Sequence, residues 1–190
     1  MAAMYYNKKL FREIMSALVK YVCFHMEDKA VVKEIEHHFD LLWNEYRGER
    51  YSTSELLHEL PEILKDEVIF NELGEIVQNV PFFEGTETSF LKKLLKIVVT
   101  NLHCPGDFIF CAGDLGEELY LVKKGFVEIL SEDLSHVVNR LGIGGYFGEF
   151  GMLNGSPYNV TVRCATYCEV LSIARSDLDK LLESYPLLQK

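Results

Sequence analysis

The chain has 190 residues, 48% of them apolar and 12% aromatic, which is enough for one substantial core or for one domain with a helical extension. Its 19 basic and 29 acidic residues give a formal net charge of −10, which argues against a nucleic-acid or anionic-membrane surface, because such surfaces depend on Lys and Arg. The longest apolar runs are far shorter than the roughly 20 residues of a membrane span, and Met1 is not followed by a signal-peptide pattern.

Residues 5 to about 80 have a helical pattern. Apolar residues recur there at spacings of three and four, as in Leu10, Ile14, Ala17 and Tyr21. Residues 52–55 (Ser-Thr-Ser-Glu) are typical of a helix start, because a Ser or Thr cap accepts a backbone amide and the Glu places a carboxylate at the positive end of the helix dipole. Pro61 fits the first turn of a helix that we expect over residues 62 to about 71.

The pattern changes near residues 81–83 (Pro-Phe-Phe). One more short helix is expected over residues 88–95, and short runs of β-branched and aromatic residues then alternate with turns that contain glycine. A last helix is expected after Ile173, capped by Ser176 and Asp177 and ended by Tyr185-Pro186. The strands are expected over residues 97–99, 108–110, 118–122, 126–130, 137–141, 160–162 and 169–173. This order predicts an α+β fold with segregated layers, whose closely spaced strands form a barrel or a jelly roll.

Candidate catalytic and metal-binding groups are dispersed. The five cysteines contain no CxxC pair, so they indicate neither a disulfide framework nor a zinc site, and a reducing cytosol is expected. His37 and His38 lie on a polar helical stretch, which favours a solvated face over a metal site. No Ser-His-Asp order, paired catalytic carboxylates or P-loop is evident, and we expect no enzyme activity.

Several motifs in the strand region resemble those of cyclic nucleotide-binding domains. Residues 105–109 (PGDFI) and 113–120 (GDLGEELY) look like the PGD-x-I and G-x-x-G-x-x-(M/L)-Y signature, and residues 125–127 (GFV) are similar to the G-x-V turn. Residues 147–149 (FGE), followed by a polar turn and Thr-Val-Arg, resemble the phosphate-binding cassette. The resemblance implies a jelly-roll-like β-roll with flanking helices over residues 81–190. The family's final lid helix has no counterpart within these residues, so it either lies beyond Lys190 or does not close on a ligand.

Other matches are most similar to hyperpolarisation-activated, cyclic nucleotide-gated and ether-a-go-go-type channels. They are residues 165–168 (ATYC), 177–178 and 185–186. Residues 1–80 resemble the helical C-linker of these channels, above all at residues 45–47 and 56–68. In the channels the C-linkers assemble into a four-fold gating ring. The resemblance therefore implies a homotetramer formed through the C-linker, at the cytoplasmic side of a cell membrane to which only upstream segments attach.

The resemblance places a ligand site around residues 148–151. Glu149 matches the acid that accepts the ribose hydroxyl of the ligand in the family. Gly148 and the backbone amides of Phe150 and Gly151 open a short helix whose donors would face an anion. No cofactor or metal is expected, and cAMP and cGMP are the regulatory ligands that the resemblance implies.

The phosphate subsite departs from the family. Binders place an arginine nine positions after the Glu, where the guanidinium fork binds phosphate, and this chain has Tyr158 there. Arg163 matches a different family arginine, which more often forms a structural ion pair. Three roles for Tyr158 stay open: its hydroxyl binds phosphate, its ring occupies the pocket, or it lies exposed on a loop. The predicted site residues are Gly148, Glu149, Phe150, Gly151, Tyr158, Asn159, Val160 and Thr161.

The main functional hypothesis is a cytosolic regulatory module of a tetrameric cation channel. It either senses a cyclic nucleotide or has weakened or lost that ability, and it acts on the pore by shifting a two-state equilibrium. One alternative is the regulatory tail of a cation/proton exchanger. Another is a purely structural domain that acts through subunit contacts.

Overall fold

A computed structural model describes residues 2–25, 32–33, 35–37, 39–40, 43, 60–131 and 133–185. The chain divides into two compact units, Met1–Lys65 and Asp66–Lys190. The predicted helix start at residues 52–55 lies outside the described residues, as do His38, Pro186 and the C-linker matches at residues 45–47 and 56–59. No helix in the described part of the chain combines the length and the apolar character that crossing a bilayer requires.

Most of the described residues of the first unit are helical. Its long helix is α1 (Ala2–His25), and the described positions between residues 32 and 43 are helical as well. Phe11 of α1 is buried, and its ring centroid lies 5.6 Å from that of Phe39 and 5.3 Å from that of Trp43. These aromatic contacts hold the helical segments of this unit together. The helical pattern of the sequence is thereby confirmed for these residues, and the assignment of residues 1–80 as a C-linker stays a prediction.

Helices precede, interrupt and follow the strands of the second unit. They are α4 (Glu62–Gln78), the 3₁₀ helix η1 (Pro81–Phe83), α5 (Thr88–Ile97), α6 (Glu149–Asn154) and α7 (Arg175–Glu183). Helix α4 continues beyond the predicted end at residue 71, because Leu73 and Val77 of its last turns are buried in the core. The predicted cap of the last helix is wrong. Ala174 precedes α7 without a side-chain cap, and the amide of Arg175 donates to the Glu117 carbonyl at 2.8 Å, so this amide needs no cap.

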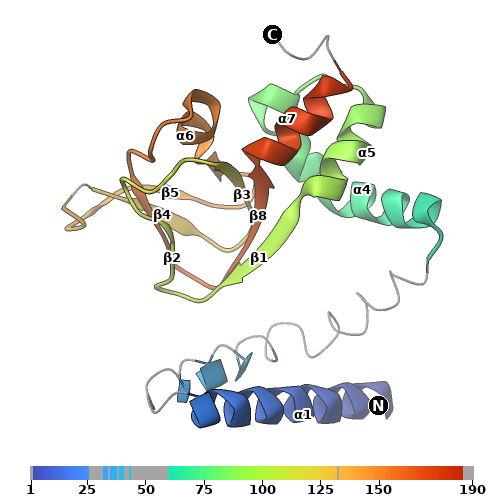
Figure 1. Ribbon diagram of the computed structural model, residues 1–190, viewed down its shortest axis with the longest axis vertical. Coiled ribbons are helices and arrows are strands. Elements are labelled where there is room, and N and C mark those ends of the chain that lie inside the picture. The colour runs from blue at the N-terminus through green and yellow to red at the C-terminus, as the bar shows by residue number, and fades with distance from the viewer. Residues whose placement is uncertain are drawn as a thin grey trace. The chain divides into compact units, whose positions relative to one another are not determined.

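Eight strands form two antiparallel sheets of four strands each (Figure 1). They are β1 (Val99–His103), β2 (Phe108–Phe110), β3 (Glu118–Lys124), β4 (Val127–Leu130), β5 (Val137–Leu141), β6 (Tyr146–Phe147), β7 (Thr161–Cys164) and β8 (Cys168–Ala174). The strand orders are β1-β8-β3-β6 and β2-β7-β4-β5. The predicted strand at residues 97–99 is wrong in its first part, because Ile97 ends α5, and the two-residue strand β6 was not predicted.

Two clusters of buried side chains stabilise this unit. In one, helices α4, α5 and α7 pack against one face of the sheet β1-β8-β3-β6, with Val77, Leu94 and Leu171 among the fully buried residues. In the other, the inner faces of the two sheets meet, with Val122, Val162 and Val170 fully buried. Alternate residues of each strand supply these contacts, as the period of two in a strand requires. The α+β jelly-roll-like fold with flanking helices is therefore confirmed.

Candidate ligand pocket

A cavity of about 570 Å³ lies at the inner face of the sheet β2-β7-β4-β5, next to the start of α6. Its volume is in the range of ordinary small-molecule sites. It is lined by Phe110, Ile129, Asn139, Leu141, Gly144, Gly145, Tyr146, Phe147, Gly148, Glu149, Phe150, Gly151, Tyr158, Asn159 and Val160. Seven of the eight predicted site residues are in this set, and Thr161 is not. The Thr161 hydroxyl accepts a hydrogen bond from the Ala112 amide at 2.9 Å and so anchors the preceding loop.

The turn into α6 requires glycine at residue 148. Gly148 has φ 84°, in the left-handed region, and a Cβ there would lie 2.8 Å from the Glu118 carbonyl oxygen. Gly151 is similarly constrained, since a Cβ on it would lie 2.8 Å from the ring of Tyr158. The two glycines let the first turn of α6 approach the strands closely, and Glu149 lies in that first turn at the edge of the cavity.

Tyr158 is part of the core. Its side chain is only 6% exposed, and its ring stacks on Phe110 with centroids 3.8 Å apart and an interplanar angle of 17°. Its hydroxyl donates to the Glu118 carbonyl at 2.9 Å and accepts from the Glu118 amide at 3.1 Å. Burial raises the pKa of Tyr158, so the phenol stays neutral. The interpretation of Tyr158 as an exposed loop residue is therefore wrong. Its ring fills part of the pocket region, and its hydroxyl already has two partners.

The lining of the cavity carries no basic side chain. Arg163, the arginine that follows Thr161 and Val162, does not line the cavity. Its Nη2 lies 2.8 Å from Glu128 Oε2, which confirms the prediction of a structural ion pair. The charge in the lining is the carboxylate of Glu149, so this pocket offers an anion no opposite charge. It offers aromatic walls, two amide side chains and one hydrogen-bond-accepting carboxylate.

Besides Gly144 and Gly145, six lining residues were not predicted as site residues: Phe110, Ile129, Asn139, Leu141, Tyr146 and Phe147. They come from strands β2, β4, β5 and β6. The alternation of side chains along the predicted strands was the signal that would have placed Asn139 and Leu141 on one face and Arg140 on the other.

A second cavity, of about 580 Å³, lies among η1, α5, α6 and α7. Phe82, Phe90, Met152 and Leu178 are in its mostly apolar lining. None of the predicted site residues borders it, so it does not belong to the site that the sequence indicates.

Comparison with known proteins finds similarity to one domain family and to several channels. Residues 102–185 match the family model of the cyclic nucleotide-binding domain. The chain is 25% identical over 184 residues to potassium/sodium hyperpolarization-activated cyclic nucleotide-gated channel 4 of Oryctolagus cuniculus. The aligned residues cover 97% of this chain and 15% of that protein. It is 24% identical to channel 2 of Mus musculus and 23% identical to channel 1 of Oryctolagus cuniculus. Both alignments cover 97% of this chain, and they cover 21% of the first relative and 20% of the second. The chain thus spans about a fifth or less of the length of these relatives. Residues 102–185 are thus similar to cyclic nucleotide-binding domains, within a chain that is similar to these channels over nearly all of its length.

Proposed function

We propose that this chain is a cytoplasmic regulatory module of a tetrameric cation channel, and that its pocket has lost tight binding of cyclic nucleotides. The family match and the similarity to named channels support a regulatory domain rather than an enzyme. They also favour a channel over the tail of an exchanger, since the channel relatives match 97% of the chain.

The internal position of Tyr158 is the observation that supports the loss of binding. The residue stands where the resemblance expects a phosphate-binding arginine, and its hydroxyl is already bonded to the backbone of Glu118. A missing charged contact of this kind costs roughly 2–5 kcal/mol, which is on the order of 30-fold to a few thousand-fold in affinity. Binding a phosphate through the Tyr158 hydroxyl would first break two internal hydrogen bonds. The carboxylate of Glu149 can still accept a ribose hydroxyl.

Weak binding limits what a nucleotide can do to the pore. A ligand shifts a two-state equilibrium only by its difference in affinity for the two states. A pocket that lacks the phosphate contact has little binding energy to divide between two states. The module then acts on the pore mainly through its contacts with other subunits, which the resemblance places in residues 1–80.

Isothermal titration with cAMP and cGMP tests this proposal. The wild-type chain is expected to give no heat at micromolar nucleotide, whereas Tyr158→Arg is expected to bind at least 30-fold more tightly, on the order of the missing charged contact. Thermal melting of each variant checks that it is folded. Micromolar binding by the wild-type chain would contradict the proposal. The tetramer is tested separately by light scattering, and a monomer at all accessible concentrations would favour another type of regulatory tail.

A further inference from the structure

Three charged side chains form a row across the outer face of the sheet β2-β7-β4-β5. Glu128 of β4 is directly opposite Arg163 of β7 and directly opposite Arg140 of β5. Residues opposite each other on adjacent strands point to the same face, so the two arginines flank the carboxylate. The neighbours Val127 and Val162 point to the core on the other face and are fully buried.

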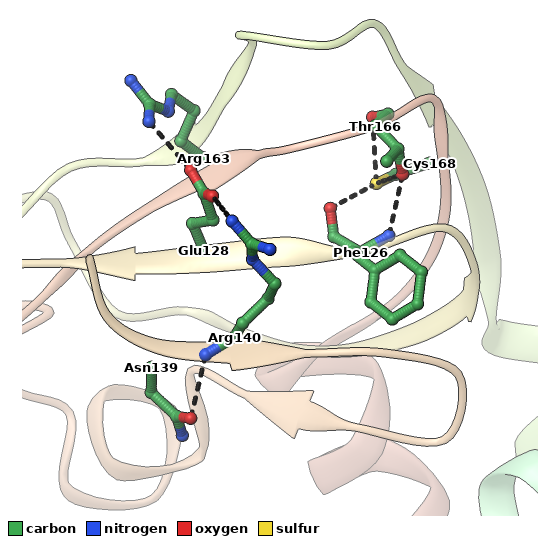
Figure 2. Close-up of polar contacts among 7 residues, drawn as sticks. All are labelled: Phe126, Glu128, Asn139, Arg140, Arg163, Thr166 and Cys168. Atoms are coloured by element: carbon green, nitrogen blue, oxygen red, sulfur yellow. Dashed lines mark hydrogen bonds and ion pairs between the residues drawn. The ribbon is translucent and has the colours of Figure 1, made fainter.

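Glu128 binds both guanidinium groups. Arg140 Nη2 lies 2.5 Å from Glu128 Oε1 and Arg163 Nη2 lies 2.8 Å from Glu128 Oε2, so the carboxylate lies between the two cations (Figure 2). Hydrogen bonds from Arg163 and Arg140 lower the pKa of Glu128, which keeps it ionised at neutral pH. Glu128 is 6% exposed, so this buried anion sets the positions of both arginines.

Each guanidinium keeps donors that Glu128 does not use. An arginine has five N–H donors, and each of these two is bonded to Glu128 through a single nitrogen. In the described part of the chain, Glu128 is the one acceptor that contacts them. The side chains of Arg140 and Arg163 are 60% and 38% exposed, and with Glu128 they carry a local charge of +1 on a chain whose net charge is −10.

Both arginines border a cleft of about 300 Å³. Gly106, Phe126, Ala165 and Thr166 complete much of its lining. The Phe126 ring is 51% exposed, and its backbone amide donates to the Thr166 hydroxyl at 2.9 Å, which fixes one wall of the cleft (Figure 2). The cleft therefore combines two positively charged guanidinium groups with an accessible aromatic ring.

We propose that this cleft binds the phosphate monoester group of a small organic molecule. A phosphate dianion offers several oxygens to two forks at once, and the planar guanidinium matches its geometry. The ring of Phe126 is positioned to contact an apolar or aromatic part of the same molecule. The site is on the opposite face of the sheet from the family pocket, so it does not depend on the function proposed above.

Titration of the 190-residue chain with phenyl phosphate, followed by NMR, tests the proposal. Saturable shifts are expected at the Nε–H signals of Arg140 and Arg163 and at the amides of Phe126 and Thr166, with a dissociation constant on the order of 1 mM or below. Inorganic phosphate should bind the same residues more weakly, because it lacks a ring, and phenol should not shift the arginine signals. Shifts that do not saturate, or that chloride reproduces, would show a structural ion cluster only and would overturn the proposal.

Substitutions distinguish the effect of the guanidinium groups on binding from the effect of net charge. Arg140→Gln removes one exposed guanidinium group and is expected to weaken phenyl phosphate binding about tenfold or more. Arg140→Lys keeps the charge, so its affinity for phenyl phosphate should lie between those of the wild type and Arg140→Gln. Lys180→Gln on α7 removes the same charge far from the cleft and should change the affinity by less than about twofold. An equal loss in Arg140→Gln and Lys180→Gln would overturn the proposal.

The source of the phosphate needs its own measurement, because phosphatidic acid in a membrane carries the same group. Cosedimentation with phosphatidylcholine vesicles containing phosphatidic acid provides it. We expect no cosedimentation, because the chain is acidic overall. Binding to vesicles without any response to phenyl phosphate would overturn the assignment to a small molecule.

Discussion

The two faces of the sheet β2-β7-β4-β5 differ in the charge they present. The inner face lines the cavity beside α6 and carries aromatic and aliphatic side chains with no cation. The outer face carries Arg140 and Arg163 around Glu128. Consecutive residues of a strand, such as Asn139 and Arg140, point to opposite faces of the sheet. An arginine in the sequence of a strand therefore does not by itself place a cation in the cavity, because the alternation of side chains decides which face receives it.

The largest effect should come from the inner face. Tyr158→Ala is expected to lower the free energy of unfolding by about 4 kcal/mol, because it removes the stacking on Phe110 and leaves the backbone of Glu118 without its hydroxyl partner. Urea unfolding measures this change. Phe150→Ala is the control, since that ring is 57% exposed, and it should cost well under half as much. Similar losses in both variants would show that Tyr158 is not held in the core.

Glu128 is the strongest test of the outer face. Glu128→Gln is expected to cost about 2 kcal/mol at pH 7, because two guanidinium groups then face each other without the intervening anion. The pKa of Glu128 is lowered, so its stabilisation is complete above the ordinary glutamate pKa of about 4.3 and is lost as the pH falls through the folded value. The difference in stability between wild type and variant should therefore shrink as the pH falls below about 4.3. A difference that stays constant down to pH 2 would rule out this ion pair as its origin.

Removing only the hydroxyl of Tyr158 should have a smaller effect than removing the whole side chain. Tyr158→Phe keeps the stacked ring and loses the two hydrogen bonds with the Glu118 backbone, and a cost of about 1 kcal/mol is expected. Unfolding measured in parallel with Tyr158→Ala separates the ring from the hydroxyl. A cost equal to that of Tyr158→Ala would mean that the stacking on Phe110 contributes little.

Arg140 should give the smallest effect on stability. Its side chain is 60% exposed, so Arg140→Gln is expected to lower the free energy of unfolding by only about 0.5 kcal/mol, and 0.5 M salt should reduce that cost further. The same denaturant titration with and without salt measures it. A cost above about 2 kcal/mol that salt leaves unchanged would place this arginine in a more buried network.

Most of the fold followed from local patterns. Strands β2 and β5 have the predicted bounds, because each is a short β-branched or aromatic run between turn residues. Ile97 was misassigned to a strand because tertiary packing overrides its β-propensity at the end of α5. The short strand β6 is held by its pairing with Tyr120 and Leu121 of β3 rather than by its own sequence.

The pocket was less predictable in its details than in its location. Gly148 and Gly151, which the resemblance assigns to the site, border the cavity in turns where a Cβ would lie within 3 Å of other atoms. The orientation of Tyr158 depends on Phe110 and Glu118, which are far away in the sequence, so no local pattern reveals it. The row of Arg140, Glu128 and Arg163 depends on the register between strands, which turns and bulges set.

The order of strands also has a consequence for synthesis on the ribosome. Strand β8 lies between β1 and β3, and β7 lies between β2 and β4, so both sheets have one of the last two strands in their interior. A nascent chain that ends before Thr161 has β1 and β2 without their partners and cannot complete either sheet. Pairing over such long sequence separations is slow. The emerging polypeptide therefore keeps apolar strand faces uncovered until β7 and β8 have left the ribosome, and an uncovered strand face of this kind promotes aggregation.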